Sequence, residues 1–283
     1  MNLEDESLIE PATQNDVDAF LETVARAPKS ALLLDYDGTL APFRVERDKA
    51  IPYPGVTAAL QEILSGTRTQ IFIVTGRKTD DIVSLLGVYP YPVIWGLHGA
   101  QRRNPDGAVE MTCVDEDLVQ ALMEADGWLQ AQDLRQTAEY KPGSIAVHWR
   151  GRSESEAETI RRLVLMGWSR IAQHRKVELL EFDGGVEMRP PEPDKGDAVR
   201  EILKKLDATT PVAYLGDDTT DEHAFEALQG RGLRVLVRPE WRQTSADIWI
   251  KPPHELLDFL AKWQKANPHK PRAISVSKGQ YQR

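Results

Sequence analysis

Short apolar runs alternate with amphipathic segments along most of this chain, and this alternation limits the folds open to it. Runs without polar interruption are typical of strands buried on both faces, as in parallel sheets. Such runs lie at 32–34, 70–74, 93–95, 212–215 and 235–237. Apolar residues have helical spacing near 17–24, 56–64, 79–86, 195–206 and 254–263. Strands that alternate with helices predict right-handed βαβ units, and therefore an α/β fold with a Rossmann-like parallel-sheet core.

The middle of the chain has a different pattern. Residues 144–149 alternate between apolar and polar, as in a half-exposed strand, and 153–167 have helical spacing. The runs 177–182 and 186–188 flank Asp183-Gly184-Gly185, which is typical of an antiparallel hairpin. This change indicates a smaller mixed α/β domain inserted into the core. We therefore predict a core at 1–107 and 191–266, the inserted domain at 108–190 and a disordered tail at 267–283.

Composition argues against several functions. The formal net charge of -9 argues against nucleic-acid binding, which needs a basic face to release counterions. No apolar stretch approaches the ~20 residues of a membrane span. The acidic start of the sequence lacks the basic and apolar regions of a signal peptide. The single cysteine, Cys113, cannot form an intrachain disulfide, which fits a reducing compartment. We therefore expect a cytoplasmic protein that binds neither nucleic acid nor membranes.

The first predicted strand, at 32–34, ends in two carboxylates, Asp35 and Asp37, followed at once by Gly38. In open α/β sheets the ligand crevice lies beyond the carboxyl ends of the strands, where these side chains would be. Two carboxylates so close repel each other unless a cation separates them or one of them takes up a proton. The pair therefore indicates a metal-assisted reaction on an anion, in which one carboxylate attacks and the other moves protons.

Three further polar motifs follow predicted strands or begin a predicted helix. Thr75-Gly76-Arg77 offers a hydroxyl and a close backbone amide to an oxyanion. Lys195 opens a helix that Asp194 caps, where the helix dipole also favours negative charge. The acidic loop at 216–222 contains Asp217, Asp218 and Asp221. Each motif alone has a simpler interpretation, namely a turn, a solvated lysine or an exposed helix start. Their meeting at one edge of one sheet favours the functional interpretation of the whole set.

These four motifs, in this order, resemble those of the haloacid-dehalogenase superfamily of aspartate-nucleophile phosphatases. The insert between the second and third motifs resembles the mixed α/β cap of that superfamily. More narrowly, residues 30–260 resemble the trehalose-6-phosphate phosphatase family. The motifs that carry this resemblance are Asp-Tyr-Asp-Gly-Thr-Leu at 35–40, Val-Thr-Gly-Arg at 74–77, Gly-Leu-His-Gly-Ala at 96–100, His-Trp-Arg at 148–150, Val-Glu-Met-Arg-Pro at 186–190 and Gly-Asp-Asp-Thr-Thr-Asp-Glu at 216–222. One departure is Gln101, where members of the family usually carry a glutamate.

The resemblance implies a Mg²⁺-dependent phosphatase that works through an aspartyl-phosphate. Asp35 would attack phosphorus, and Asp37 would protonate the leaving oxygen and then deprotonate the attacking water. Thr75 and Lys195 would hold the non-bridging oxygens of the phosphate. The implied metal-site residues are Asp35, Asp37 through its backbone carbonyl, Asp217, and, as residues that orient water or the loop, Asp218 and Asp221. The residues expected to bind the substrate around its phosphate are Gly38, Thr39, Gly76 and Arg77.

The inserted cap is expected to select the substrate. By the same resemblance, Glu139, Lys141 and Glu187 would bind hydroxyl groups of the trehalose part of the substrate. A simpler alternative, with a solvated turn at 139–141 and a surface residue at 187, stays open here. We expect His98 and His148 to be hydrogen-bonded structural residues. A site divided between two lobes also predicts a cap that opens and closes around the substrate.

The expected reaction is hydrolysis of trehalose 6-phosphate to trehalose and phosphate, the last step of trehalose biosynthesis. The expected partner is this small sugar phosphate, and a trehalose-phosphate synthase is a candidate protein partner. One alternative is a phosphatase for sucrose phosphate or glucosylglycerol phosphate. Another is an inactive sugar-phosphate-binding protein that regulates a partner. Such proteins usually lose the nucleophile or a metal carboxylate, whereas Asp35, Asp37, Lys195 and Asp217 are all present.

Overall fold

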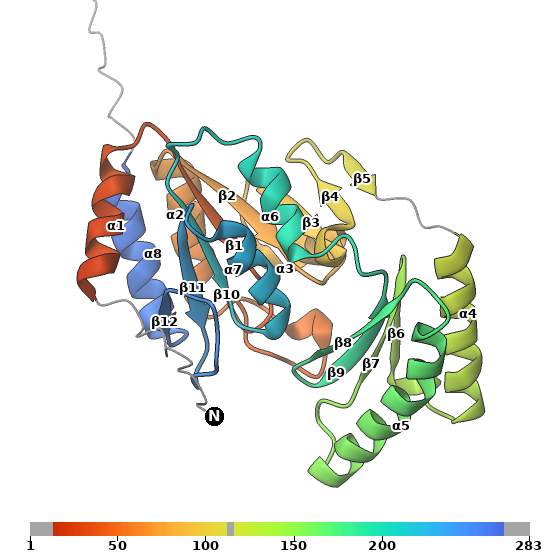
Figure 1. Ribbon diagram of the computed structural model, residues 1–283. Coiled ribbons are helices and arrows are strands. Elements are labelled where there is room, and N and C mark those ends of the chain that lie inside the picture. The colour runs from red at the N-terminus through yellow and green to blue at the C-terminus, as the bar shows by residue number, and fades with distance from the viewer. Residues whose placement is uncertain (1–13, 112–115, 269–283) are drawn as a thin grey trace, which may run out of the picture.

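The computed structural model describes residues 14–111 and 116–268, which form two lobes (Figure 1). The larger lobe is built on an eight-stranded sheet in the order β12-β11-β10-β1-β2-β3-β4-β5. Its parallel strands are β1 (Ser30–Leu34), β2 (Thr69–Val74), β3 (Val93–Gly96), β10 (Val212–Gly216), β11 (Leu233–Val237) and β12 (Ile248–Ile250). Antiparallel pairing extends the sheet through β4 (Gln101–Arg103) and β5 (Val109–Met111). The predicted α/β fold with a parallel-sheet core is confirmed.

Helices cover both faces of this sheet. One face carries α1 (Gln14–Arg26), α2 (Val56–Gly66), α3 (Thr79–Leu86) and α8 (His254–Ala266), and the other carries α6 (Lys195–Leu203) and α7 (Glu222–Leu228). In β1, Leu32 and Leu34 join the hydrophobic cluster under the first group of helices, whereas Ala31 and Leu33 join the cluster under the second. All four side chains are inaccessible to solvent. Burial on both faces explains why this strand is apolar throughout.

The smaller lobe, which we call the cap, has its own antiparallel sheet in the order β6-β7-β9-β8. Its strands are β6 (Ala138–Lys141), β7 (Ser144–His148), β8 (Glu178–Phe182) and β9 (Gly185–Arg189). On one face, α4 (Glu116–Ala131) and α5 (Glu154–Ala172) close a separate hydrophobic core. Val186 and Met188 of β9 join that core, whereas Glu187 points to the opposite face and contacts the larger lobe. The face of the cap sheet that carries Glu187 is therefore turned toward the larger lobe, with α4 and α5 on the other side of the sheet (Figure 1).

The described part of the chain has four short 3-10 turns, and the three in the larger lobe contact the cap. The turns are η1 (Arg47–Lys49), η2 (Leu97–Gly99), η3 (Arg135–Thr137) and η4 (Thr219–Asp221). From the larger lobe, Arg47 in η1, His98 in η2 and Thr219 in η4 each contact a residue of the cap. Within residues 14–111 and 116–268, no helix is long and apolar enough to span a membrane.

Two features differ from the predicted domain boundaries. The sheet of the larger lobe continues through β5, beyond the predicted boundary after residue 107. Asn267, predicted to start a disordered tail, is fully buried. Its Nδ2 donates to the hydroxyl of Ser30 at 2.7 Å, and its Oδ1 accepts from Nε of Arg68 at 2.7 Å. Asn267 is therefore part of the packed core, because it satisfies polar groups at the start of the sheet, and the predicted tail began too early. The rest of that tail, from residue 269, lies outside the described residues.

Candidate active site

The predicted catalytic side chains meet where three neighbouring strands end. β1 lies between β2 and β10, so the residues that directly follow these strands, Asp35, Thr75 and Asp217, come together. Lys195, the first residue of α6, reaches the same place. Each of the four residues is at most 3% exposed. A cavity between the lobes is lined here by Asp35, Asp37, Thr75, Gly76, Arg77, Lys195, Asp217 and Asp218, and from the cap by Lys141, His148 and Glu187.

Lys195 lies between two carboxylates. Its Nζ donates to Oδ1 of Asp35 at 2.9 Å and to Oδ1 of Asp221 at 2.7 Å. Asp221 also accepts from the hydroxyl of Tyr214 at 2.6 Å and from the first two backbone amides after β10, both at 3.0 Å. Burial would lower the pKa of Lys195, but the carboxylates of Asp221 and Asp35 outweigh it and raise that pKa. Lys195 therefore stays charged, and Asp221 fixes both the lysine and the acidic loop.

The carboxylates at this point fit a divalent cation. Asp35, Asp217 and Asp221 offer oxygen atoms that lie within 4.8 Å of one another. Burial, partly offset by Lys195, raises the pKa of Asp35 to about 7. Burial and the charge of Asp35 raise the pKa of Asp217 well above its usual value. Oδ1 of Asp217 is buried and has no hydrogen-bond partner in the described part of the chain. A cation would offset the repulsion and bind this oxygen, and carboxylate oxygens are ligands that suit Mg²⁺.

Asp37 is held in place by Arg77. Nε and Nη2 of Arg77 donate to the two carboxylate oxygens of Asp37, both at 2.6 Å. Nη1 of Arg77 donates to the backbone carbonyl of Arg47 at 2.7 Å. A bidentate pair of this kind fixes the plane of the carboxylate, and 26% of the Asp37 side chain remains exposed. Arg77, predicted to bind substrate, is thus engaged with Asp37 in the structure.

The predicted substrate-binding residues next to the carboxylates divide into two groups. Gly38 has a φ of 80°, and a Cβ at this position would lie 2.0 Å from Oδ2 of Asp217. A Cβ on Gly76 would lie 2.6 Å from Nε2 of His98, so both glycines allow a close approach. Thr39, by contrast, is fully buried and does not line the cavity. The structure therefore does not bring Thr39 to the site, because its side chain packs inside the lobe.

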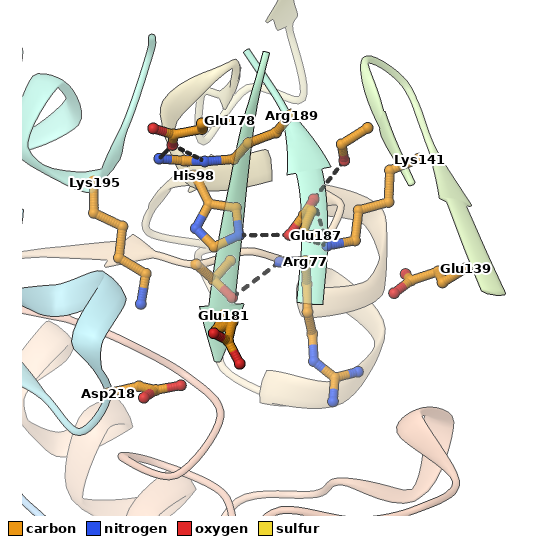
Figure 2. A network of polar contacts seen from close by, with 12 residues as sticks. Arg77, His98, Glu139, Lys141, Glu178, Glu181, Glu187, Arg189, Lys195 and Asp218 are labelled. Atoms are coloured by element: carbon orange, nitrogen blue, oxygen red, sulfur yellow. Dashed lines mark hydrogen bonds and ion pairs between the residues drawn. The ribbon is translucent and has the colours of Figure 1, made fainter. Parts of the chain in front are cut away.

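Glu187 is the centre of a buried polar network on the cap (Figure 2). Its carboxylate accepts from Nζ of Lys141, which is 3.1 Å from each oxygen, and from the hydroxyl of Ser144. Nε2 of His98, from the larger lobe, lies 3.2 Å from the same carboxylate. Burial would raise the pKa of Glu187, but Lys141 and His98 outweigh it and hold that pKa well below its usual value. Glu187 is therefore a buried anion rather than a surface residue of the hairpin.

The two histidines near the cap are neutral. Burial lowers the pKa of His98 to about 4, although its contact with Glu187 opposes this shift. Burial and the nearby charge of Arg47 lower the pKa of His148 to about 3. Nε2 of His148 lies 3.1 Å from Oε2 of Glu139. Both imidazoles thus have hydrogen-bond partners at neutral pH, as expected for structural residues.

Glu139 has partners in both lobes. Besides His148, its carboxylate forms an ion pair with the guanidinium of Arg47 from the larger lobe. Glu139 does not line the cavity that contains Asp35, but borders a neighbouring depression together with Arg47 and Arg77, which line both. The structure therefore separates Glu139 from Lys141 and Glu187, with which it was grouped.

Asp218 connects the acidic loop to the cap. Its Oδ2 accepts from the backbone amide of Asp183 at 3.0 Å, in the turn between β8 and β9. The next residue, Thr219, donates its hydroxyl to the carbonyl of Glu181 at 3.3 Å. Asp218, predicted to orient water or the loop near the metal, therefore forms a contact between the lobes that the sequence did not indicate.

Three residues of the site were absent from the predictions. Tyr214 holds Asp221 through its hydroxyl, and its position in the apolar run just before the acidic loop was a usable signal. Nε and Nη2 of Arg242 donate to the backbone carbonyls of Asp217 at 3.1 Å and Asp218 at 2.7 Å. Arg47 contacts Glu139 across the lobes. Arg242 lies in a loop and Arg47 in the short turn η1, and neither stands in a recognisable motif, so only the folded chain reveals them.

Comparison with known proteins agrees with this geometry. A family model described as trehalose-phosphatase matches residues 33–247, which include all four motifs and the whole cap. The chain belongs to this family. The trehalose-phosphate phosphatase of Mycobacterium avium is 31% identical over 223 residues, which cover 74% of this chain and 54% of that protein. The chain spans 54% to 61% of the length of the mycobacterial trehalose-phosphate phosphatases it matches.

Solved structures with the same fold include two proteins from Candida albicans. The C-terminal domain of its trehalose-6-phosphate phosphatase superposes with a TM-score of 0.78, covering 92% of this chain and 99% of that one at 20% identity. The C-terminal domain of its trehalose synthase regulatory protein has a TM-score of 0.66, covering 90% of this chain and 99% of that one at 15% identity. At these identities the likeness shows the fold alone, so the activity must be argued from the residues.

Proposed function

We propose that the protein hydrolyses trehalose 6-phosphate to trehalose and inorganic phosphate. The observation that carries this proposal is the meeting of Asp35, Lys195 and Asp217 beneath the polar face of the cap. A buried carboxylate 2.9 Å from a buried ammonium, beside a set of oxygens that fits a cation, suits nucleophilic attack on an anionic phosphate. Membership of the trehalose-phosphatase family supports the choice of sugar.

The proposed reaction has two steps. Asp35 attacks phosphorus and forms an aspartyl-phosphate, while the bond between phosphorus and the sugar oxygen breaks. Asp37 gives a proton to that oxygen, so the sugar leaves as an alcohol. Asp37 then takes a proton from water, which attacks phosphorus, releases phosphate and restores the carboxylate of Asp35. The two hydrogen bonds from Arg77 fix the plane of the Asp37 carboxylate, as the second step, in which this carboxylate takes the proton, requires.

Lys195, the hydroxyl of Thr75 and the backbone amide of Gly76 are the groups we assign to the non-bridging oxygens of the phosphate. Enzymes accelerate the hydrolysis of phosphate monoesters by up to ~10²¹-fold. General acid–base catalysis supplies only ~10²–10⁴ of that factor. Most of the acceleration must therefore come from positioning and from the positive groups around the phosphate.

We assign the Mg²⁺ site to the carboxylates of Asp35 and Asp217 and to the backbone carbonyl of Asp37. The unpartnered Oδ1 of Asp217 supports this set, since a buried carboxylate oxygen needs a partner. When bound, the cation supplies positive charge that offsets the repulsion among the carboxylates and the phosphate. Asp221 accepts hydrogen bonds from four donors of the protein, so we assign it to holding the acidic loop. Asp218 would orient the loop from its contact with the cap.

Lys141 and Glu187 are the cap residues best placed to bind sugar hydroxyls, because they line the same cavity as Asp35. A site built from buried charged groups rejects analogues that lack matching hydroxyls, since the groups would then be unpaired. Glu139 would act at the edge of this site, through its contacts with Arg47 and His148. The alternative substrates, sucrose phosphate and glucosylglycerol phosphate, differ in the hydroxyls that they present to the same groups.

An inactive regulatory role remains the second candidate, since a domain named as regulatory shares the fold. Against it, the chain keeps the whole set of groups that the two-step reaction needs. Those groups are Asp35, Asp37, Lys195 and Asp217.

The deciding experiment is phosphate release from trehalose 6-phosphate, sucrose 6-phosphate, glucosylglycerol phosphate and glucose 6-phosphate, each with and without Mg²⁺. We expect Mg²⁺-dependent turnover with the highest kcat/KM for trehalose 6-phosphate. The matched control is Asp35→Asn, which should fold and be inactive. Preference for another sugar phosphate would reject the substrate, and turnover by Asp35→Asn would reject the nucleophile. Binding without turnover of any substrate would favour the regulatory role.

We also propose a cytoplasmic location, supported by the single cysteine of the sequence. A trehalose-phosphate synthase would supply the substrate, and its direct association with this chain stays a prediction. Sedimentation of the two purified proteins together tests that association.

A further inference from the structure

One loop of the larger lobe meets the cap at three points. The ring of Phe43 lies under the guanidinium of Arg150 from the cap, 4.2 Å from its centroid. Val45 lies so close to Gly151 that a Cβ on the glycine would be 2.9 Å from its Cγ2. Arg47 forms the ion pair with Glu139. Because this segment, residues 43–47, contacts the cap at all three points, a movement of the cap would change the contacts of the segment.

The same segment is tied to the catalytic loop. The backbone carbonyl of Arg47 accepts Nη1 of Arg77 at 2.7 Å, and Arg77 holds both carboxylate oxygens of Asp37. Just beyond the segment, the hydroxyl of Tyr36 donates to the carbonyl of Ala50 at 2.7 Å. A continuous line of hydrogen bonds and ion pairs thus runs from Asp37 through Arg77 and Arg47 to Glu139 of the cap.

Burial differs along this line. The side chain of Arg77 is only 4% exposed, whereas those of Arg47 and Glu139 are 30% and 25% exposed. The inner part of the line is fixed within the larger lobe, and its outer pair joins two lobes. Separation of the lobes breaks this outer pair first, because it is the only link of the line that crosses between them.

We propose that Arg47 is a positioning residue that couples closure of the cap to the orientation of Asp37. This proposal rests on the proposed function, since Asp37 matters only as the group that moves protons. With the cap closed, Glu139 holds the side chain of Arg47, and the backbone of Arg47 holds Arg77 in the position that orients Asp37. With the cap open, this restraint on Arg47 is lost.

Arg47→Ala tests the side chain alone, since the variant keeps the carbonyl that Arg77 uses. An ion pair that is partly exposed contributes more than a surface pair and less than a buried one, so we expect kcat/KM for trehalose 6-phosphate to fall about tenfold. Arg47→Lys should recover part of this loss. The matched control is Lys49→Ala, because Lys49 lies in the same turn and, among residues 14–111 and 116–268, forms its ion pair with Glu46, outside the site. We expect this control to match the wild type.

Two comparisons separate positioning from a general structural effect. Arg47 also lines the cavity that contains Asp35, so the comparison is made in kcat at saturating substrate, which a lost contact with bound sugar would change less than KM. The kcat loss for Arg47→Ala should be large on trehalose 6-phosphate and much smaller on p-nitrophenyl phosphate, whose leaving group departs without a proton. In a double-mutant cycle, Arg47→Ala combined with Glu139→Gln should lose no more than the larger single loss. Equal losses on both substrates, or additive losses in the cycle, would overturn the coupling.

A measurement without turnover distinguishes failure of this proposal from failure of the proposed function. Small-angle X-ray scattering in the presence of Mg²⁺ and beryllium fluoride, a phosphoryl mimic, reports the separation of the lobes. We expect a larger radius of gyration for Arg47→Ala than for the wild type and Lys49→Ala. Equal radii would overturn the role of Arg47 in closure. Absence of wild-type activity on trehalose 6-phosphate would reject the proposed function. The scattering measurement does not depend on turnover, so it would still test whether Arg47 contributes to closure of the cap.

Discussion

Asp221 offers the sharpest test of how the site is held together. It is fully buried, and each of its oxygens accepts two hydrogen bonds. Oδ1 accepts from Lys195 at 2.7 Å and from Tyr214 at 2.6 Å, and Oδ2 accepts from two backbone amides at 3.0 Å. Asp221→Asn keeps the shape of the side chain but replaces one oxygen by an amide group. In either orientation that amide faces two donors, so two hydrogen bonds are lost.

The magnitude follows from the number of donors left without an acceptor. A buried donor that loses its acceptor costs about 1–3 kcal/mol. Two such donors make the expected loss of unfolding free energy about 4 kcal/mol. The loss is not larger because the ammonium of Lys195 still pairs with Asp35. The control is Tyr214→Phe, which removes one donor and leaves the oxygen with Lys195. This variant should lose only about 1 kcal/mol.

Urea unfolding followed by tryptophan fluorescence measures both losses, and the chain has seven tryptophans as probes. We expect a large fall of the unfolding midpoint for Asp221→Asn, a small fall for Tyr214→Phe and similar slopes for both. Phosphate release should fall as well, because Lys195 loses one of the two groups that orient it. A loss for Asp221→Asn no greater than that for Tyr214→Phe would refute the reasoning, since it would mean that the four hydrogen bonds do not hold the acidic loop.

Three other predictions concern single features of the site. Gly38→Ala would place a Cβ 2.0 Å from Oδ2 of Asp217, and the resulting shift of that carboxylate should reduce phosphate release about 100-fold. Unchanged release would mean that the reaction does not depend on the position of Asp217. Because burial lowers the pKa of His98 from 6.5 to about 4, the unfolded state takes up its proton first as the pH falls. The wild type should therefore lose about 3 kcal/mol of stability between pH 6.5 and pH 4 that it keeps above pH 6.5, and the urea midpoint of His98→Asn should change less over this range. An equal pH dependence in the variant would contradict the neutral imidazole. At 100 times its Kd, Mg²⁺ should stabilise the folded protein by about 2.7 kcal/mol and so raise the thermal unfolding midpoint. Asp217→Asn should abolish most of this response, and a full response would place the cation elsewhere.

The parallel sheet and the convergence of the site could be predicted because both depend on local signals. Strands buried on both faces, such as β1, are continuous apolar runs, and the residue after each run lies at the same edge of the sheet. Asp35, Thr75, Lys195 and Asp217 were therefore predictable from their places after strands or at a helix start. Local signals also predicted the hairpin of β8 and β9, through the two glycines of its turn.

Other parts of the fold have weak or unused signals. β4 and β12 are three-residue strands, which are too short to show an alternating pattern, and their pairing depends on the sheet beside them. α4 does carry apolar residues with helical spacing, such as Leu118, Ala125 and Leu129, although this signal was not used. Asn267 was misjudged because a polar residue near a basic tail gives no sign of the hydroxyl that it binds inside the core.

The arrangement of the lobes was the main part of the site that the sequence could not predict. The pairing of Arg47 with Glu139 and the contact of Asp218 with the turn of the cap each join residues of the two lobes. The motif around Asp35 suggested that Thr39 binds substrate, but its side chain packs inside the larger lobe. A motif predicts which residues occur together, whereas the direction of each side chain depends on the packing around it.

The cap builds its hydrophobic core from α4, α5 and one face of its own sheet, apart from the core of the larger lobe. Positions 141 and 187 lie on the other face of that sheet, so substitutions there leave this hydrophobic core intact, but the buried Lys141–Glu187 pair can be replaced only as a unit, because either charge alone would be buried without its partner. A change of ligand preference therefore needs coordinated substitutions within this one network. This separation makes the inward face of the cap sheet a convenient surface for engineering new ligand specificities.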